Sequence, residues 1–205
     1  MEKINLFTST LYPFQKKDWL DKLNTLTNPI INNLKNKTKD KFGHIYHSEN
    51  LNKNNNFEFI YKHILKQANN ILTLQGFDLK NHKLNITSFW VQEFSSLGGS
   101  HHSLHTHYDS HISGFYFLKC NQNTSFPIFE DPRNGALMNK LPEKNNKNIT
   151  DASSQIHIKF NPGSGVFFNS YLPHQFTVDN GREPFRFIHW NIQAVPKEKE
   201  MAKDV

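Results

Sequence analysis

Residues 104–119 read Leu-His-Thr-His-Tyr-Asp-Ser-His-Ile-Ser-Gly-Phe-Tyr-Phe-Leu-Lys. The segment predicts two short strands, at about Leu104–Asp109 and Ile112–Lys119, because β-branched and aromatic residues recur on either side of a small polar break. Six further strands are expected at Leu84–Phe94, Ser125–Glu130, Gln155–Phe160, Gly165–Asn169, His174–Asp179 and Phe185–Gln193. Eight short strands separated by Gly, Pro, Asn and Asp indicate a mainly β fold, a double-stranded β-helix or jelly roll.

Two amphipathic helices are expected before these strands. Apolar residues recur every three or four positions from Lys16 to Lys35, with an interruption near Pro29, and again over Asn54–Leu74. Helices laid on the outside of one sheet would explain why several strands are apolar on both faces. We therefore expect one domain over residues 1–205, with a helical N-terminal part at 1–82, a β-helix core at 83–195 and a loop-like polar insertion at Asn134–Ser154.

The composition narrows the class of protein. Aromatic residues make up 13% of the chain, with 18 Phe, so the core should be built largely from rings packed on a sheet. The single cysteine, Cys120, rules out a disulfide scaffold and a cysteine-based zinc cluster. With no signal peptide and no apolar run near the ~18 residues of a membrane span, we expect a cytoplasmic protein without a membrane partner. The net charge of +6 comes largely from Lys residues scattered or in polar loops, so a nucleic acid partner is not expected.

Histidine is concentrated in one short stretch of the chain. Of the 12 His residues, five fall within residues 101–111, namely His101, His102, His105, His107 and His111. Side chains two residues apart on a strand stand about 6.5 Å from each other along it and can share an ion, whereas those four apart, at about 13 Å, cannot. Two metal ligands from this strand must therefore be a neighbouring pair. His107-Tyr108-Asp109 supplies an imidazole and a carboxylate at this spacing.

A third ligand must come from elsewhere in the sequence. The best candidate is His174, which opens a predicted strand directly after Pro173. His107, Asp109 and His174 would form the triad of two His and one carboxylate that holds iron(II) and leaves positions open for a cosubstrate and oxygen. The remaining histidines of the cluster are expected to be hydrogen-bond partners, substrate contacts or surface residues. His189, which alternates with Phe residues, is expected to be a histidine of the core.

One arginine lies in a strand that is apolar on both faces. Arg186 shares its face with Ile188 and Trp190, and a buried guanidinium needs an anionic partner because it cannot lose its charge. The far carboxylate of a dicarboxylate cosubstrate would satisfy this need with a bidentate pair. An ion pair with an internal Asp or Glu is the alternative. Arg182, in the preceding turn, is less suited because it should be solvated.

These segments together resemble the 2-oxoglutarate (2OG) and iron(II)-dependent dioxygenase superfamily, and more narrowly the 2OG-Fe(II) oxygenases of marine bacteria and their phages. The resemblance rests on His105–Leu118, Phe129–Arg133, Pro162–His174 and Arg186–Asn191, and the lead-in Leu6–Thr10 looks like the family's opening strand. It implies a double-stranded β-helix that binds iron(II) through His107, Asp109 and His174, and 2OG through Arg186. Relatives often show a non-acidic residue in place of Asp109 after a His-x-His, which leaves His105 and His107 as alternative ligands. Many also carry paired Tyr where this chain has Tyr116-Phe117.

The resemblance also implies a reaction. Molecular oxygen and 2OG would be consumed, 2OG would be decarboxylated to succinate, and a C–H bond of a peptide, such as a prolyl group, or of a small metabolite would be hydroxylated. A cupin-type metalloenzyme with His105, His107 and His174 as ligands is one alternative. A non-catalytic jelly-roll binding module is the other.

Overall fold

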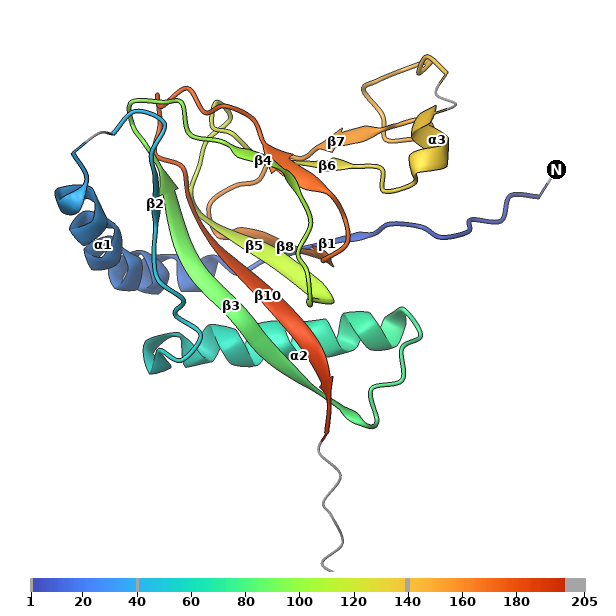
Figure 1. Cartoon of the computed structure of the whole chain (residues 1–205), viewed down its shortest axis with the longest axis horizontal. Helices are drawn as coiled ribbons and strands as arrows, with labels where there is room; N and C mark the ends of the chain where they lie inside the picture. The colour runs from blue at the N-terminus through green and yellow to red at the C-terminus, as the bar shows by residue number, and fades with distance from the viewer. Residues whose placement is uncertain (1, 40, 139–140, 198–205) are drawn as a thin grey trace, which may run out of the picture.

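Two antiparallel sheets form the body of the computed structural model, which describes residues 2–39, 41–138 and 141–197. One sheet has the strand order β1-β8-β5-β10-β3-β2 and the other β4-β9-β6-β7 (Figure 1). The strands are β1 Leu11–Gln15, β2 Ile45–His47, β3 His82–Phe94, β4 His102–His105, β5 Ile112–Lys119, β6 Pro127–Glu130, β7 Gln155–His157, β8 Ser164–Asn169, β9 His174–Phe176 and β10 Arg186–Pro196. The mainly β jelly roll predicted from the sequence is confirmed.

Strand β10 lies in the middle of the six-stranded sheet, between β5 and β3 (Figure 1). Side chains alternate between the faces of a strand, and both faces of β10 are buried. Ile188 and Trp190 belong to the cluster that the helices cover, whereas Phe187 belongs to the cluster between the two sheets. The pairing with β3 shifts register between Asn191 and Ile192.

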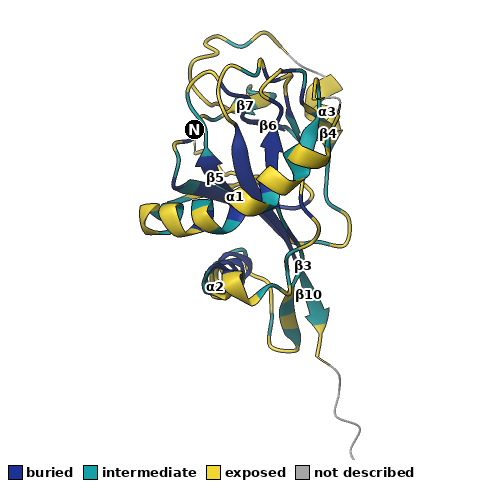
Figure 2. Ribbon diagram, turned by 90° about the vertical axis from the view of Figure 1, so that its left-hand side faces the viewer, coloured by how far each residue is buried: buried dark blue, intermediate teal, exposed yellow. Residues whose placement is uncertain are grey.

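Two helices cover the outer face of the six-stranded sheet. Helix α1, Leu20–Lys37, follows the short 3-10 turn Lys17–Trp19, and helix α2, Glu58–Leu74, follows the turn Asn55–Phe57. Figure 2 shows their buried sides turned toward the sheet and their exposed sides toward solvent. Among the described residues, no helix combines the length and the hydropathy that crossing a membrane requires.

The predicted interruption near Pro29 is wrong, because α1 runs unbroken through this residue. A proline inside a helix removes one backbone hydrogen bond, that to the carbonyl of Thr25. Both Thr25 and Pro29 are exposed, so water can satisfy the freed carbonyl. Burial of Leu23 and Ile31 on either side holds the helix against the sheet.

The space between the sheets is filled by aromatic rings. Ten of the twelve buried members of this cluster are Phe, among them Phe115, Phe176 and Phe187, as the composition predicted. Rings of Phe176 and Phe187 stack with centroids 5.0 Å apart, across the gap between the two sheets. Such packing gives a rigid, dry interior for any site that opens into it.

The described structure differs from the sequence prediction in its short elements. The opening strand suggested at Leu6–Thr10 lies later, as β1 at Leu11–Gln15. Strand β2 was not expected, and its three residues are too few to show an alternating pattern. The insertion at 134–154 contains a short helix, α3, Asn134–Met138, and its residues 139 and 140 lie outside the described part. The strand expected at Leu104–Asp109 ends at His105, which changes the arrangement of the site.

Candidate metal centre

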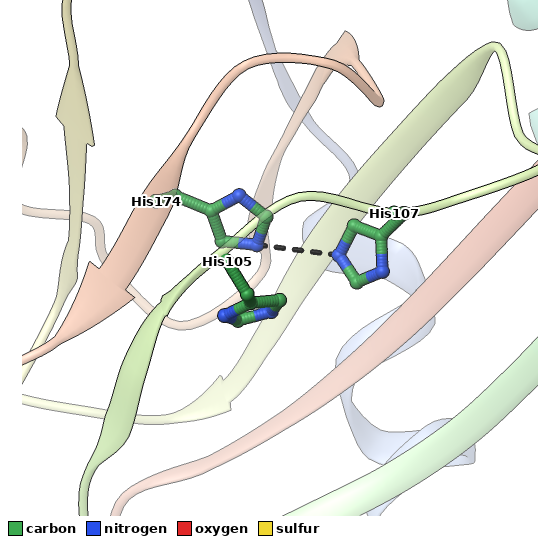
Figure 3. A group of neighbouring side chains, drawn as sticks. All are labelled: His105, His107 and His174. Atoms are coloured by element: carbon green, nitrogen blue, oxygen red, sulfur yellow. Dashed lines mark hydrogen bonds between the residues drawn. The ribbon is translucent and has the colours of Figure 1, made fainter.

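Three histidines converge at one end of the four-stranded sheet, where Figure 3 shows their rings facing a common point. His105 is the last residue of β4 and lies opposite His174, the first residue of β9. His107 follows two residues later in the loop, and its backbone N–H donates to the carbonyl of Ser170 at 3.0 Å. One ligand nitrogen from each ring lies within 4.8 Å of the other two.

Backbone carbonyls fix the proton on two of the three rings. Nδ1 of His174 lies 3.0 Å from the carbonyl oxygen of Leu172, and Nδ1 of His105 lies 2.7 Å from that of Ser103. A carbonyl oxygen only accepts, so each Nδ1 carries the hydrogen and each Nε2 keeps its lone pair. These are the tautomers that a metal-binding histidine adopts when its other nitrogen donates a hydrogen bond.

The ring of His107 is held in place by a series of hydrogen-bonded polar side chains. Nδ1 of His107 lies 3.3 Å from the side-chain amide of Asn191, whose other end lies 2.7 Å from the hydroxyl of Ser113. The Ser113 hydroxyl lies 2.8 Å from that of Ser170. The amide nitrogen of Asn191 donates to Nδ1 of His107, and its amide oxygen accepts from the Ser113 hydroxyl, so this chain of hydrogen bonds fixes the orientation of the His107 ring.

The two Nε2 atoms of His107 and His174 then face each other at 3.3 Å. The two nitrogens share a hydrogen bond, and a cation bound between the rings would take the place of its proton. Three imidazole nitrogens are also a donor set that suits iron and other divalent transition metals. The residues present therefore fit an iron(II) ion.

Burial keeps these rings unprotonated. Desolvation lowers the pKa of His107 to about 4 and the pKa of His174 to about 3. A ring must be neutral to bind a metal. Both rings are therefore neutral at neutral pH, as metal binding requires.

Asp109 does not lie with the histidines. The chain leaves β4 at His105 and turns at residues 108–109, where Asp109 adopts a left-handed backbone with φ 53°. The alternation that would place Asp109 beside His107 is lost in this turn, and Asp109 is exposed. The structure thus groups His107 and His174 with His105, the alternative that the sequence left open.

Asp109 instead lines an open hollow of about 340 Å³. Thr87, Ser88, Thr106 and Ser110 also line it, and His107 and Asn191 border it.

Arg186 lies on the helix-covered face of the six-stranded sheet, away from the three histidines. Its Nε donates to Glu93 at 2.5 Å, and its Nη1 donates to Asn28 of α1 at 2.6 Å. Lys35 of α1 also pairs with Glu93. Arg186 is 1% exposed, so its charge is balanced inside the protein. This is the internal ion pair that the sequence left as the alternative to cosubstrate binding.

A small cavity of about 30 Å³ opens beside the three histidines. Its remaining lining is Trp90, Gln92, His102, Phe115, Phe176, Phe187 and His189. None of these described lining residues is Lys, Arg, Asp or Glu, so the walls carry no permanent charge. The volume holds about one water molecule.

Sequence reasoning gave no role to Asn191 and Ser113 and placed His189 in the core. Each is a polar residue in a strand that is otherwise apolar, and that contrast was the available signal. Alternation also places His189 and Asn191 on one face of β10. The sequence could not tell that this face lines the site.

Residues 88–188 match the model of a family described as "Putative 2OG-Fe(II) oxygenase". Over this region the chain is similar to the 2OG-Fe(II) oxygenases. The resemblance inferred from the sequence is thereby confirmed, and the family is named for the two cofactors expected, iron(II) and 2OG. The matched region contains all three converging histidines. No curated protein matches the chain in sequence.

Solved structures resemble the chain in fold at low sequence identity. AviO1 from Streptomyces viridochromogenes has a TM-score of 0.63 at 10% identity and covers 90% of each chain. A prolyl-4-hydroxylase from Pseudomonas putida has a TM-score of 0.56 at 12% identity, over 91% of this chain and 94% of that one. SnoN, a non-heme alpha ketoglutarate dependent epimerase from nogalamycin biosynthesis, has a TM-score of 0.58 at 9% identity, over 95% of this chain and 83% of that one. The matched region is thus part of a fold that spans nearly the whole chain.

Proposed function

We propose that the chain is an oxygenase that binds iron(II) through His105, His107 and His174 and uses 2OG and molecular oxygen. The observation that carries this proposal is the convergence of three ring nitrogens within 4.8 Å, two of them freed for a metal by backbone hydrogen bonds. Three ligands on one side of an iron ion leave positions open for the cosubstrate and oxygen. Asp109, which was expected to be a ligand, has no part in this proposal.

Hydroxylation of a C–H bond is the reaction we propose, with 2OG decarboxylated to succinate. When bound, iron(II) supplies the activation of oxygen. The chain's own residues hold the ion, fix its ligands through Leu172, Ser103 and Asn191, and exclude water with the surrounding Phe rings. A peptidyl or small-molecule substrate is proposed, because the structural neighbours include a prolyl hydroxylase and an epimerase of antibiotic biosynthesis.

Iron and 2OG binding can be tested without a substrate. Anaerobic addition of Fe(II) and 2OG should give the weak visible charge-transfer band of a chelated 2-oxo acid. His105→Ala should abolish the band, whereas Asp109→Ala and the exposed control His101→Ala should leave it unchanged. Loss of the band in Asp109→Ala with retention in His105→Ala would restore the carboxylate ligand and overturn the three-histidine centre.

The same three histidines also suit the cupin alternative. A cupin would bind the metal but give no charge-transfer band with 2OG. Metal binding measured by calorimetry, together with the absence of the band, would therefore favour the cupin alternative over the oxygenase.

A further inference from the structure

The small cavity beside the three histidines cannot hold an organic substrate. It has room for about one water molecule, so a substrate of the proposed oxygenase must bind outside it. The open hollow of about 340 Å³ borders the metal centre, because its lining includes His107 and Asn191. A larger hollow of about 390 Å³ lies along the N-terminal segment, and its described lining contains none of the three histidines. The hollow beside His107 is therefore the candidate binding space.

His107 connects this hollow to the metal centre. Its ring lines both the hollow and the small cavity. Nε2 of His107 lies 3.3 Å from Nε2 of His174, whereas Nδ1 lies 3.3 Å from the side-chain amide of Asn191, which borders the hollow. A group bound in the hollow therefore lies against a ring whose opposite edge faces the proposed metal position.

Hydroxyl groups make up most of the polar lining of the hollow. One hydroxyl each comes from Thr87, Ser88, Thr106, Tyr108 and Ser110. The hydroxyl of Thr87 donates to the backbone carbonyl of Asn191 at 3.2 Å. Those of Ser88, Thr106 and Ser110 make no hydrogen bond to another described residue. Each hydroxyl can donate one hydrogen bond and accept two, so the hollow offers donors and acceptors together.

Asp109 adds a carboxylate to this lining. It forms no ion pair within the described part of the chain, and the described lining contains no Lys or Arg. Its left-handed backbone, with φ 53°, costs free energy in a non-glycine residue, and such residues recur at sites that hold a ligand. An anionic ligand would be repelled by Asp109, with no lining cation to hold it.

The balance of donors and acceptors narrows the ligand further. An ammonium group only donates, so it would leave the hydrogens of the lining hydroxyls unused. An apolar ligand would find no aliphatic side chain larger than a threonine methyl group. A polyhydroxylated group both donates and accepts, and its C–H face can pack on the ring of Tyr108, which is 89% exposed. The hollow is also large enough for a small ligand, since ligand sites begin at about 300 Å³.

We propose that this hollow binds a neutral, polyhydroxylated part of the substrate, such as a sugar ring, through Asp109 and the neighbouring hydroxyls. This inference rests on the proposed function and names a substrate class for the same site. It also gives Asp109 a role as a substrate-binding residue, although the residue lies apart from the three metal-binding histidines.

The test measures sugar binding to the full chain loaded with Zn(II), which is diamagnetic. D-glucose, D-galactose and D-ribose are titrated in turn while the proton NMR signals of the sugar are recorded. At least one sugar should give saturable binding. Asp109→Asn and Ser88→Ala should each weaken that binding at least threefold. Asp21→Asn, at an exposed position of α1, is the matched control and should bind within 1.5-fold of the parent.

A second measurement asks whether the sugar binds beside the metal centre. The titration is repeated with Co(II), which is paramagnetic, in place of Zn(II). Signals of a sugar bound against His107 should be broader in the Co(II) protein than in the Zn(II) protein at the same occupancy.

Each outcome supports or refutes a separate claim. If none of the three sugars saturates, the sugar class is wrong, and binding of ethanolamine in their place would identify an amine site instead. Sugar binding that survives both Asp109→Asn and Ser88→Ala, or equal line widths with the two metals, refutes the hollow as the substrate site. Absence of the charge-transfer band with Fe(II) and 2OG refutes the proposed function, and the Zn(II) titration reads sugar binding independently of that band.

Discussion

At the scale of single residues, Asn191 is predicted to set the orientation of His107. Asn191→Ala removes the hydrogen bond to Nδ1 and should lower metal affinity by about 10–100-fold, the usual effect of losing a partner of a metal ligand. Co(II) titration followed by its visible absorption measures this affinity. Asn85→Ala, at an exposed position on the neighbouring strand β3, is the matched control. Unchanged Co(II) affinity in Asn191→Ala would contradict the prediction that Asn191 orients His107.

The residue scale also shows where sequence reasoning succeeded and where it could not. The sequence proposed His107 from its spacing to Asp109 and His174 from its position after Pro173, and the structure brings these two rings together. The choice of Asp109 over His105 assumed that the strand continued to residue 109. The strand instead ends at His105, and Asp109 has a left-handed backbone although it is not a glycine. The sequence has no Gly or Pro at this turn that would have predicted it.

At the scale of elements, the Arg186 and Glu93 pair joins β10 and β3 to helix α1. Arg186→Met should cost about 3 kcal/mol of unfolding free energy, the lower end for a broken buried pair, because Lys35 still neutralises Glu93. Adding Glu93→Gln should recover much of this loss. Urea denaturation of the single and double variants measures both. A double variant no more stable than Arg186→Met would contradict the pairing.

The close approach of β5 to Trp190 gives a second element-scale prediction. A Cβ on Gly114 would lie 2.4 Å from the Trp190 ring and 2.7 Å from the Val166 carbonyl. Gly114→Ala should therefore destabilise the fold by about 1–3 kcal/mol through overpacking. Gly135→Ala, where a Cβ meets nothing within 4 Å, serves as the control in the same thermal unfolding experiment. Equal melting temperatures for the two variants would rule out the predicted clash.

The alternation of side chains along β10 predicted which residues share a face of the strand. It did not predict which of the two faces lines the site. Arg186 was correctly grouped with Ile188 and Trp190, and His189 with Phe187. Both faces of this strand are buried, one under helices and the other between sheets. The hydrophobic pattern of the sequence therefore does not distinguish the two faces of β10. For this reason the sequence could not decide between an internal acid and a cosubstrate as the partner of Arg186.

At the scale of the whole molecule, buried histidines are predicted to make the metal-free protein sensitive to acid. Burial lowers the pKa of His102 and His107 to about 4, that of His174 to about 3 and that of His189 well below its usual 6.5. The unfolded chain binds protons near pH 6.5 and the folded chain does not, so stability falls as pH drops from about 6.5 toward 4. Each ring contributes up to about 1.4 kcal/mol per pH unit.

Urea midpoints of chelator-treated protein between pH 7.5 and about pH 5 measure this dependence. His189→Phe removes one of the four rings, so its midpoint should fall less steeply with acid than that of the parent. Parallel curves for the two proteins would contradict the prediction for His189.

The proposed three-histidine donor set would affect the redox state of a bound iron ion. Imidazoles bring no charge, so an iron(II) ion and a doubly negative 2OG bound there as proposed would cancel in charge, and the assembly among the Phe rings would be electroneutral. A carboxylate ligand would leave a net negative charge that needs a nearby cation, and the described cavity walls have none. Oxidation to the ferric ion would instead leave an unbalanced positive charge in a dry interior. The donor set should therefore raise the reduction potential of the centre and favour the ferrous state.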